Sequence, residues 1–171
     1  MVRRGILTFA LLALAGCAAG PSGLSPMAAS PPISPDQDFL NRAVTGTGNE
    51  VELGRLAQER GFARPVRVFG AHIAAEHARA HAGLMALAQR LNLVPDAQMA
   101  DLSGLAGLSG PEFDRQFIAD QIKNQREALA LFESGARTAQ DPRLQRFARE
   151  WVAMLRRDLA RAENIGVQFG V

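Results

Sequence analysis

The chain is poor in cysteine, lysine and polar aromatic residues, and these shortages exclude several kinds of site. Its 171 residues include one cysteine, one tryptophan, no tyrosine and a single lysine, Lys123. One cysteine can form neither an internal disulfide nor a multi-thiolate metal site. No apolar run approaches the roughly 20 residues that a membrane-spanning helix needs. We therefore expect no disulfide, no cysteine-based zinc site and no spanning helix.

The one cysteine, Cys17, ends a short apolar segment near the N-terminus. Arg3 and Arg4 precede a run rich in Leu, Ala and Phe, which leads to Leu-Ala-Gly-Cys at residues 14–17. This order resembles a bacterial lipoprotein signal, so we predict that residues 1–16 are cleaved and that Cys17 is lipidated. Several acyl chains would give stable anchoring. Because Ala18 follows the cysteine where aspartate often marks inner-membrane retention, we expect the outer membrane. The alternative is an ordinary secretory signal with a chance cysteine.

Removal of the signal would balance the charge of the chain. The full chain has 19 basic and 17 acidic residues, and the loss of Arg3 and Arg4 leaves 17 of each. Bulk charge therefore gives no support for a nucleic-acid partner. Residues 17–33 are rich in Pro, Gly, Ser and Ala, which predicts a flexible tether with a reach of roughly 50 Å if extended. The expected partners are the membrane, through the N-terminal lipid, and an envelope protein.

Residues 34–171 contain four segments with helical spacing of apolar residues and no sustained alternation of period two. Each segment has a start signal: Ser34-Pro35, Pro65, Ser109 with Glu112 in a capping box, and Asp141-Pro142. Gly46 and Gly48 mark a point where the first helix is expected to kink or split. Residues 94–108 are predicted to form a connection with one short helical turn. The pattern predicts one all-α domain, an up-down-up-down four-helix bundle over 34–171.

Polar residues interrupt the apolar stripe of every predicted helix. They are Glu50, His77, Gln125 and Asp158, one on each segment. Glu50, His77 and Asp158 would form a transition-metal site of nitrogen and oxygen ligands if they met in the bundle, with Glu76 or Gln125 in support. The alternative, which we favour, is that they are hydrogen-bonded core groups that set helix register.

Enzymatic sites of familiar kinds are missing from the pattern. The chain has no defensible Ser-His-Asp arrangement, no phosphate-binding loop and no cysteine pair. A di-iron bundle would need Glu three residues before a ligating histidine. The three histidines His72, His77 and His81 instead follow Phe69, Ala74 and Ala78 at that spacing. We therefore expect neither oxidase chemistry nor a catalytic residue.

Three blocks of the chain carry a family resemblance. They are Phe39-Leu40 with residues 49–57, then 66–84, then 113–133. In this order they resemble the bacterial domain of unknown function 4142, and the likeness extends over residues 36–163. The resemblance implies a ferritin-like bundle in an exported protein.

The resemblance also marks where this chain departs from the family pattern. Glu50 and His77 are present, and Glu76-His77 stands where the family usually has Asp-His. The family commonly has histidine at the positions of Gln125 and Asp158. The resemblance thus implies that this chain lacks two histidines of any metal or proton-transfer site the family forms.

Two functions from different classes follow. The favoured one is a non-catalytic, lipid-anchored envelope protein that binds a partner or supports the envelope, without a cofactor. The alternative is a ferritin-like metal-binding or redox protein that uses Glu50, His77 and Asp158. A third hypothesis, binding of a small apolar ligand in the bundle core, has only the available Phe and Met residues in its favour.

Overall fold

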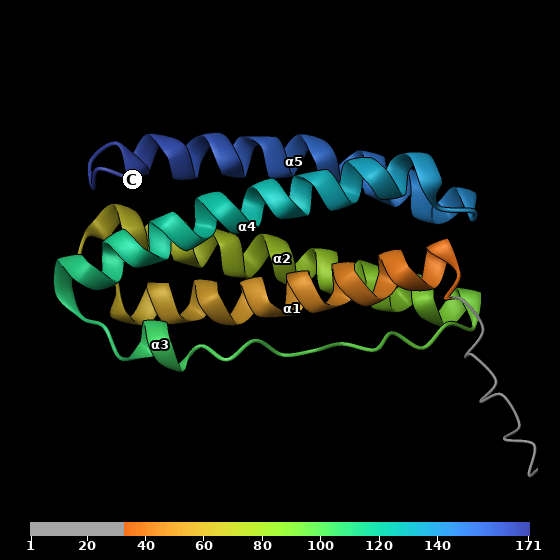
Figure 1. Ribbon diagram of the computed structural model, residues 1–171, viewed down its shortest axis with the longest axis horizontal. Coiled ribbons are helices and arrows are strands. Elements are labelled where there is room, and N and C mark those ends of the chain that lie inside the picture. The colour runs from red at the N-terminus through yellow and green to blue at the C-terminus, as the bar shows by residue number, and fades with distance from the viewer. Residues whose placement is uncertain (1–32) are drawn as a thin grey trace, which may run out of the picture. The chain divides into compact units, whose positions relative to one another are not determined.

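A computed structural model of the protein describes residues 33–171, in which every regular element is a helix. The elements are α1 (Pro35–Arg60), α2 (Arg64–Leu91), α3 (Ser103–Ala106), α4 (Gly110–Thr138) and α5 (Pro142–Gly166). The four long helices form a four-helix bundle, and α3 is a single turn beside it (Figure 1). The predicted all-α, ferritin-like bundle is therefore confirmed. The predicted signal peptide, Cys17 and the tether up to residue 32 lie outside the described residues.

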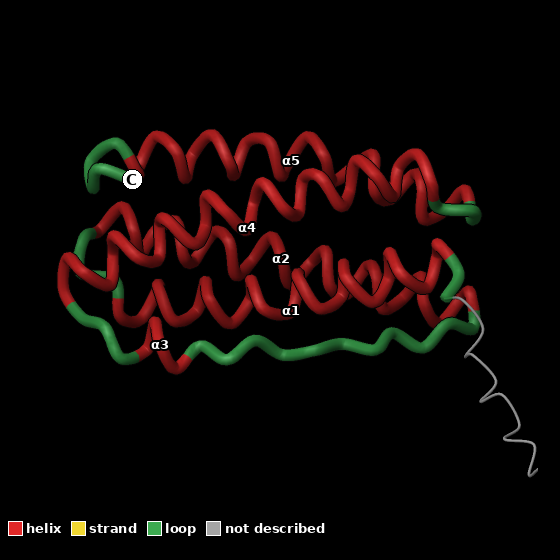
Figure 2. The backbone as a smooth tube through the Cα atoms, in the orientation of Figure 1, coloured by secondary structure: helices red, strands yellow, loops and turns green. Residues whose placement is uncertain are grey.

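The bundle consists of two helical hairpins joined by a long crossover. α1 packs against α2, and α4 packs against α5. Residues 92–109 run back along the whole bundle before α4 begins (Figure 2). α4 consequently starts beside the start of α2 and runs in the same direction. This differs from the simple alternation of direction that short connections produce, and it is the arrangement of ferritin-like folds with one long crossover.

The crossover is held to α1 by a ladder of polar side chains. Gln37, Asn41, Thr45 and Asn49 lie four residues apart on α1, and they hydrogen-bond the backbone of the alternate residues 94, 96, 98 and 100. Four residues of helix rise about 6.0 Å, and two extended residues cover about 6.4–6.8 Å. The two spacings nearly match, so the ladder fixes an extended segment along the helix.

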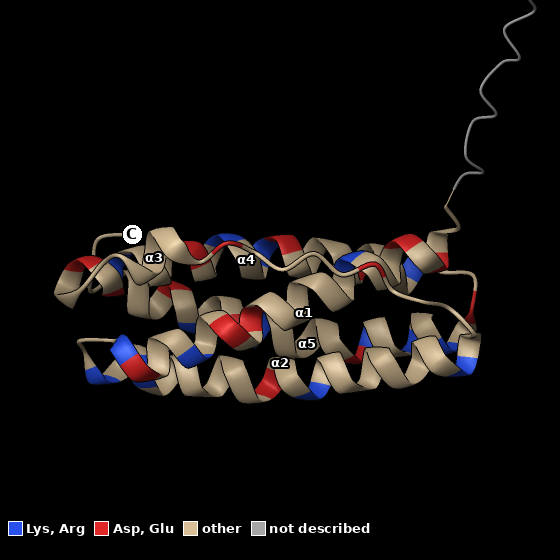
Figure 3. Ribbon diagram, turned by 90° about the horizontal axis from the view of Figure 1, so that it is seen from below, with Lys and Arg blue, Asp and Glu red and all other residues tan. Residues whose placement is uncertain are grey.

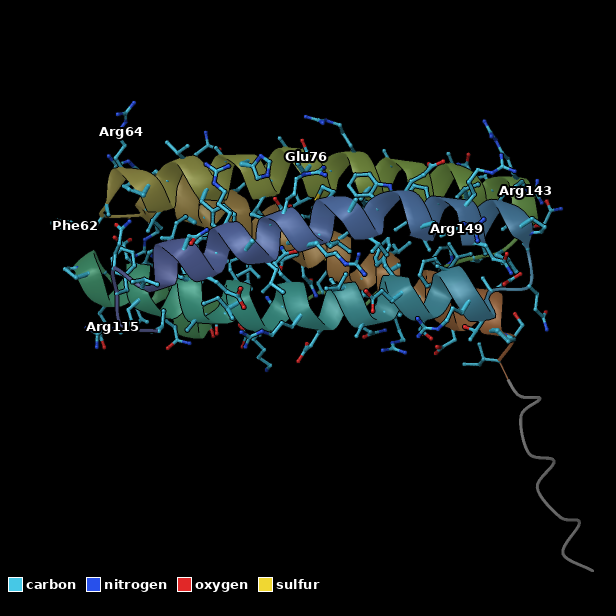
Figure 4. All side chains as sticks on the ribbon, turned by 90° about the horizontal axis from the view of Figure 1, so that it is seen from above. Phe62, Arg64, Glu76, Arg115, Arg143 and Arg149 are labelled. Atoms are coloured by element: carbon cyan, nitrogen blue, oxygen red, sulfur yellow. The ribbon has the colours of Figure 1, made fainter. Side chains whose placement is uncertain are left out.

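A carboxylate from one hairpin clamps the turn of the other at each end of the bundle. Asp114 of α4 accepts hydrogen bonds from the backbone N–H groups of Phe62 and Ala63, at 2.8 and 2.7 Å. Asp36 of α1 accepts from the N–H groups of Gln140 and Asp141, at 2.5 and 3.0 Å. These bonds satisfy backbone donors of the turns and align the two hairpins. Figure 4 shows Phe62, Arg64 and Arg115 at one of these ends and Arg143 at the other.

The predicted helix starts are confirmed, and two of the three predicted side-chain caps form. The Ser34 hydroxyl accepts from the N–H of Gln37, and the Asp141 carboxylate accepts from the N–H of Arg143. The capping box at Ser109 is wrong, because its side chain makes no cap hydrogen bond. α1 continues unbroken through Gly46, so the expected kink is also absent. Tertiary packing along α1 outweighs the cost of glycine in the helix.

The apolar core divides into two clusters. The Phe132 cluster contains Phe39, Leu40, Ala43, Val44, Leu84, Ala88, Phe132, Ala139, Leu144, Ala148, Met154 and Leu155. The Phe117 cluster contains Leu53, Ala57, Val66, Phe69, Ile73, Leu105, Phe113, Phe117, Ile118, Ala162 and Ile165. Both clusters and both turn clamps lie within 33–171, so this segment is a self-contained compact unit. None of its helices combines the length and the apolar character required to cross a membrane.

Candidate functional site: a polar layer and a cavity in the bundle core

A layer of buried polar side chains separates the two apolar clusters. All four predicted polar residues, Glu50, His77, Gln125 and Asp158, are at most 5% exposed. Gln121, which the sequence analysis did not single out, is fully buried beside them. Burial of so many polar groups is costly unless each is hydrogen-bonded, so their pairing decides what the layer can do.

Glu50 of α1 is held by amide groups of α4. Gln121 Nε2 donates to one carboxylate oxygen at 2.7 Å, and Asn124 Nδ2 donates to the other at 2.8 Å. Burial raises the pKa of Glu50 to about 7, although these two hydrogen bonds oppose the rise. Asp120 and Asp158 raise it further by charge repulsion. At neutral pH the carboxyl group is therefore balanced between its protonated and ionised forms.

His77 of α2 is joined to Glu50 through two amides. Gln125 Nε2 lies 3.3 Å from His77 Nε2 and also donates to Gln121 Oε1 at 3.4 Å. With the amide oriented this way, His77 Nε2 accepts and Nδ1 carries the proton. Burial lowers the pKa of His77 to about 4, so the ring is neutral at pH 7. Its Nδ1 has no hydrogen-bond partner among residues 33–171.

Asp158 of α5 pairs with a different histidine from the one predicted. Its Oδ1 lies 2.7 Å from Nε2 of His72, whose side chain is 34% exposed. The other carboxylate oxygen, Oδ2, is buried without a partner. Burial raises the pKa of Asp158, and the hydrogen bond from His72 partly offsets the rise. This hydrogen bond links α2 to α5.

The predicted metal ligands are not brought together as a set. Glu50 contacts amides, His77 contacts Gln125, and Asp158 contacts His72. Across residues 33–171, no group of three or more His, Cys, Asp or Glu side chains is arranged to hold a metal ion. Glu76, the predicted support, pairs instead with Arg79 at 2.8 Å on the outer side of α2 (Figure 4). The residues of the polar layer therefore do not fit a metal centre.

A cavity of about 310 Å³ extends from the polar layer into the Phe132 cluster. Glu50, His77 and Asn124 line its polar part. Arg42 and Gly46 of α1 and Glu127 of α4 are exposed lining residues, which places the mouth between these two helices. The apolar part is lined by Ala43, Leu53, Ala80, Ala128, Leu131, Phe132, Trp151, Met154 and Leu155. A mostly apolar cavity of this size with a few converging polar groups is typical of a small-ligand site.

Spacing along α4 contained a signal for the residues that sequence reasoning missed. Phe113, Phe117, Gln121 and Gln125 follow one another at four-residue intervals and therefore share one buried face. The same spacing that identified Gln125 as a core residue could therefore have identified Gln121. No comparable signal marks His72, because its importance comes from Asp158 on another helix.

Comparison with known proteins supports the fold. No curated protein matches this sequence. A DUF305 fragment from Deinococcus radiodurans is similar in structure, with a TM-score of 0.70, 20% identity, and coverage of 81% of this chain and 99% of that one. A DUF305 protein from Streptomyces coelicolor, described as secreted, has a TM-score of 0.72 at 15% identity, covering 81% and 95%. CopM in its Cu(I)-bound form has a TM-score of 0.67 at 16% identity, covering 75% and 93%.

At these identities the likeness concerns the fold alone. Sequence evidence gives the closer relationship, since the domain of unknown function DUF4142 matches residues 22–165, which include all four long helices almost completely. The chain therefore belongs to the DUF4142 family, as its three sequence blocks predicted.

Proposed function

We propose that this protein is a non-catalytic, lipid-anchored binding protein of the bacterial cell envelope that holds a small molecule in its bundle core. The cavity beside Glu50 and His77 carries this proposal. The lipobox at residues 14–17 supports export and anchoring, with the outer membrane as the destination. The secreted DUF305 protein of the same fold is compatible with a location outside the cytoplasm.

Binding in the core is favoured over a purely supporting role because the layer keeps unpaired polar atoms. His77, which lines the cavity, has its Nδ1 buried without a partner in the described residues; Gln125 Oε1 and Asp158 Oδ2 are also unpaired there, but their residues do not line the cavity. Such atoms cost about 1–3 kcal/mol each when they stay unsatisfied. A protein that served only as a spacer would gain stability by replacing them with apolar residues. A ligand or ordered water in the cavity that reaches His77 Nδ1 removes the cost of that atom.

The test uses the bundle of residues 33–171 and the single tryptophan, Trp151, which lines the cavity. Hexan-1-ol and hexylamine serve as probes. We expect at least one of them to shift the Trp151 emission and to raise the melting temperature, because a ligand that binds the folded state stabilises it.

Substitution of Ala128→Phe fills the cavity and should abolish both effects. The matched control is Ala130→Phe, because Ala130 is exposed on the same helix and does not line the cavity. If neither probe perturbs Trp151, or if the filled variant responds like the wild type, core binding is excluded.

Metal binding is the second candidate function, and CopM, which was solved with Cu(I), gives reason to test it. The polar layer does not supply the ligands, but a soft pair lies elsewhere. A side-chain carbon placed on Gly48 would be 3.6 Å from His81 Nδ1 and 3.9 Å from Met99 Sδ. Both groups therefore lie close to the same point on α1. Thioether and imidazole groups suit Cu(I). Stoichiometric copper that is lost in Met99→Leu and retained in Glu50→Gln would replace the ligand proposal with a metal function.

A further inference from the structure

Glu50 is a buried carboxylate that no positive charge compensates. Its hydrogen-bond partners are the neutral amides of Gln121 and Asn124. The charges that act on it most, Asp120 and Asp158, are negative. A buried charge is normally paired with an opposite one, and here the counter-charge is missing from residues 33–171.

The cavity beside Glu50 has the lining expected for an organic cation. Glu50 forms part of the wall, and Glu127 adds a second carboxylate at the mouth. Farther in, the walls are formed by Phe132, Trp151 and Met154. Aromatic rings attract cations through their faces and also cover apolar groups. The only basic side chain in the lining, Arg42, is exposed and pairs with Asp38 at 3.6 Å.

We propose that the cavity binds a small primary amine in its ammonium form, with the charged head on the Glu50 carboxylate and an apolar body against Phe132 and Trp151. This inference rests on the proposed core-binding function and names its ligand class. Each carboxylate oxygen of Glu50 accepts one amide hydrogen bond and keeps a second acceptor site for the ammonium group. An ammonium–carboxylate pair in a partly dry site is stronger than a neutral hydrogen bond.

The other groups around Glu50 are compatible with a cation. His77, which faces it from α2, is neutral at pH 7 because its pKa is lowered to about 4. Asp120 of α4 and Asp158 of α5 are acidic, as is Glu127 at the mouth. An anionic ligand would therefore meet Glu50 and Glu127 in the lining, with the negative charges of Asp120 and Asp158 nearby. A metal ion would find no third His, Cys, Asp or Glu ligand within the described chain.

Binding of a cation should also depend on pH. The ammonium group binds the ionised form of Glu50, so protons compete with it below the Glu50 pKa of about 7. A primary alkylamine stays protonated from about pH 5 to about pH 8, like the lysine side chain. Any loss of affinity in this range therefore comes from protonation of the Glu50 carboxyl group or of its neighbours, and not from a change in the charge of the ligand.

The experiment compares three probes of equal length that differ in charge: hexylamine, hexan-1-ol and hexanoate. Each is titrated into the bundle 33–171 by calorimetry and by Trp151 emission. At about pH 8 we expect hexylamine to bind at least about tenfold more tightly than hexan-1-ol, which corresponds to about 1.4 kcal/mol. At about pH 5.5 the ionised fraction of Glu50 is about thirtyfold lower, so this advantage should be lost.

Two matched variants separate charge from shape. Glu50→Gln keeps the hydrogen-bonding capacity and should weaken hexylamine by about tenfold or more while changing hexan-1-ol by less than about threefold. Glu59→Gln, an exposed residue on the same helix, should change neither. The comparison of probes on the wild-type protein needs no variant, so a folding defect in Glu50→Gln would leave the main test intact.

Each result has a defined meaning. Tighter binding of hexylamine that requires Glu50 and weakens in acid supports the amine class. If hexan-1-ol or hexanoate binds as well as hexylamine, or if Glu50→Gln leaves hexylamine binding unchanged, the amine class is wrong although core binding stands. If none of the three probes binds, both this inference and the proposed function fail.

Discussion

Individual residues of the polar layer control how stability depends on pH, and two of them act in opposite directions. The pKa of Glu50 is raised from 4.5 to about 7, and that of His77 is lowered from 6.5 to about 4. Between these limits the folded protein binds more protons than the unfolded chain at Glu50 and fewer at His77. As pH rises, Glu50 therefore lowers the unfolding free energy, whereas His77 raises it. Each effect is on the order of 3 kcal/mol.

The first prediction follows from this cancellation. The two contributions of the wild-type protein should largely offset each other between about pH 4 and pH 7. In Glu50→Gln, the His77 effect is no longer offset by Glu50, so the unfolding free energy should rise more with pH across this window than it does in the wild-type protein. In His77→Gln it should fall with pH instead, and Asp158, whose pKa is also raised, adds to that fall. Urea unfolding at a series of pH values measures both slopes.

The double variant is the control for this prediction. Asp158 is present in every variant, so its effect is common to all four proteins. Glu50→Gln combined with His77→Gln should recover a profile close to that of the wild type. Parallel profiles for the two single variants would show that these groups do not titrate as their burial implies.

At the scale of the helices, packing of α1 on α2 depends on a direct backbone contact. A side-chain carbon on Gly54 would lie 2.6 Å from the backbone oxygen of Gly70 and 2.6 Å from the backbone nitrogen of Ala74. Neither backbone atom can move without a shift of the helix. Gly46, on the same helix, is exposed and has nothing within 4 Å of such a carbon. Close packing of α1 on α2 therefore requires glycine at position 54 but not at position 46. Each glycine lowers the intrinsic helix propensity of α1.

We predict that alanine has opposite effects at these two positions. Gly54→Ala should destabilise the bundle by about 2–3 kcal/mol, because the added methyl group forces the two helices apart. Gly46→Ala should stabilise it by about 0.5–1 kcal/mol, because alanine is the better helix former and meets no obstacle. Chemical denaturation of residues 33–171 measures both changes. Equal effects of the two substitutions would contradict the proposed backbone contact.

At the scale of the whole molecule, the bundle of residues 33–171 carries equal numbers of basic and acidic residues, as we calculated for the chain without its predicted signal. On the face shown in Figure 3, basic and acidic segments are interspersed along the helices. Exposed ion pairs such as Arg126–Glu163 and Arg156–Glu133 link α4 to α5, and each contributes little to stability. If the proposed lipid on Cys17 is present, attachment to the envelope should depend on it and not on surface charge.

The corresponding prediction concerns Cys17. In cells supplied with radiolabelled palmitate, the wild-type protein should be labelled, and mass spectrometry should find an acylated Cys17 at its N-terminus. Cys17→Ala should lose the label, whereas Ser25→Ala, in the predicted tether, should keep it. Label that persists in Cys17→Ala would contradict the lipoprotein assignment.

The fold was largely predictable because its signals are local. Helix starts at Ser34 and Asp141 depend on a side chain and an N–H group two or three residues away, and both were correct. The crossover was harder, since residues 92–109 have little periodicity of their own. The ladder that orders them is visible only once Asn41 and Asn49 are seen beside the backbone of residues 96 and 100. The capping box predicted at Ser109 was wrong: the residue types allow the cap hydrogen bond, but they do not force the Ser109 side chain to form it.

The amino-acid pattern was sufficient for the helices, the family, the presence of polar residues in the core and the candidate lipid anchor. These properties depend on periodicity and on short motifs, which are encoded within a few residues of each other. Which polar groups pair was settled by three-dimensional packing: Glu50 with Gln121 and Asn124, and Asp158 with His72. The cavity and the uncompensated charge of Glu50 also arise there. Both depend on distances between separate helices. The residue spacing within one helix does not determine its direction or rotation relative to another helix.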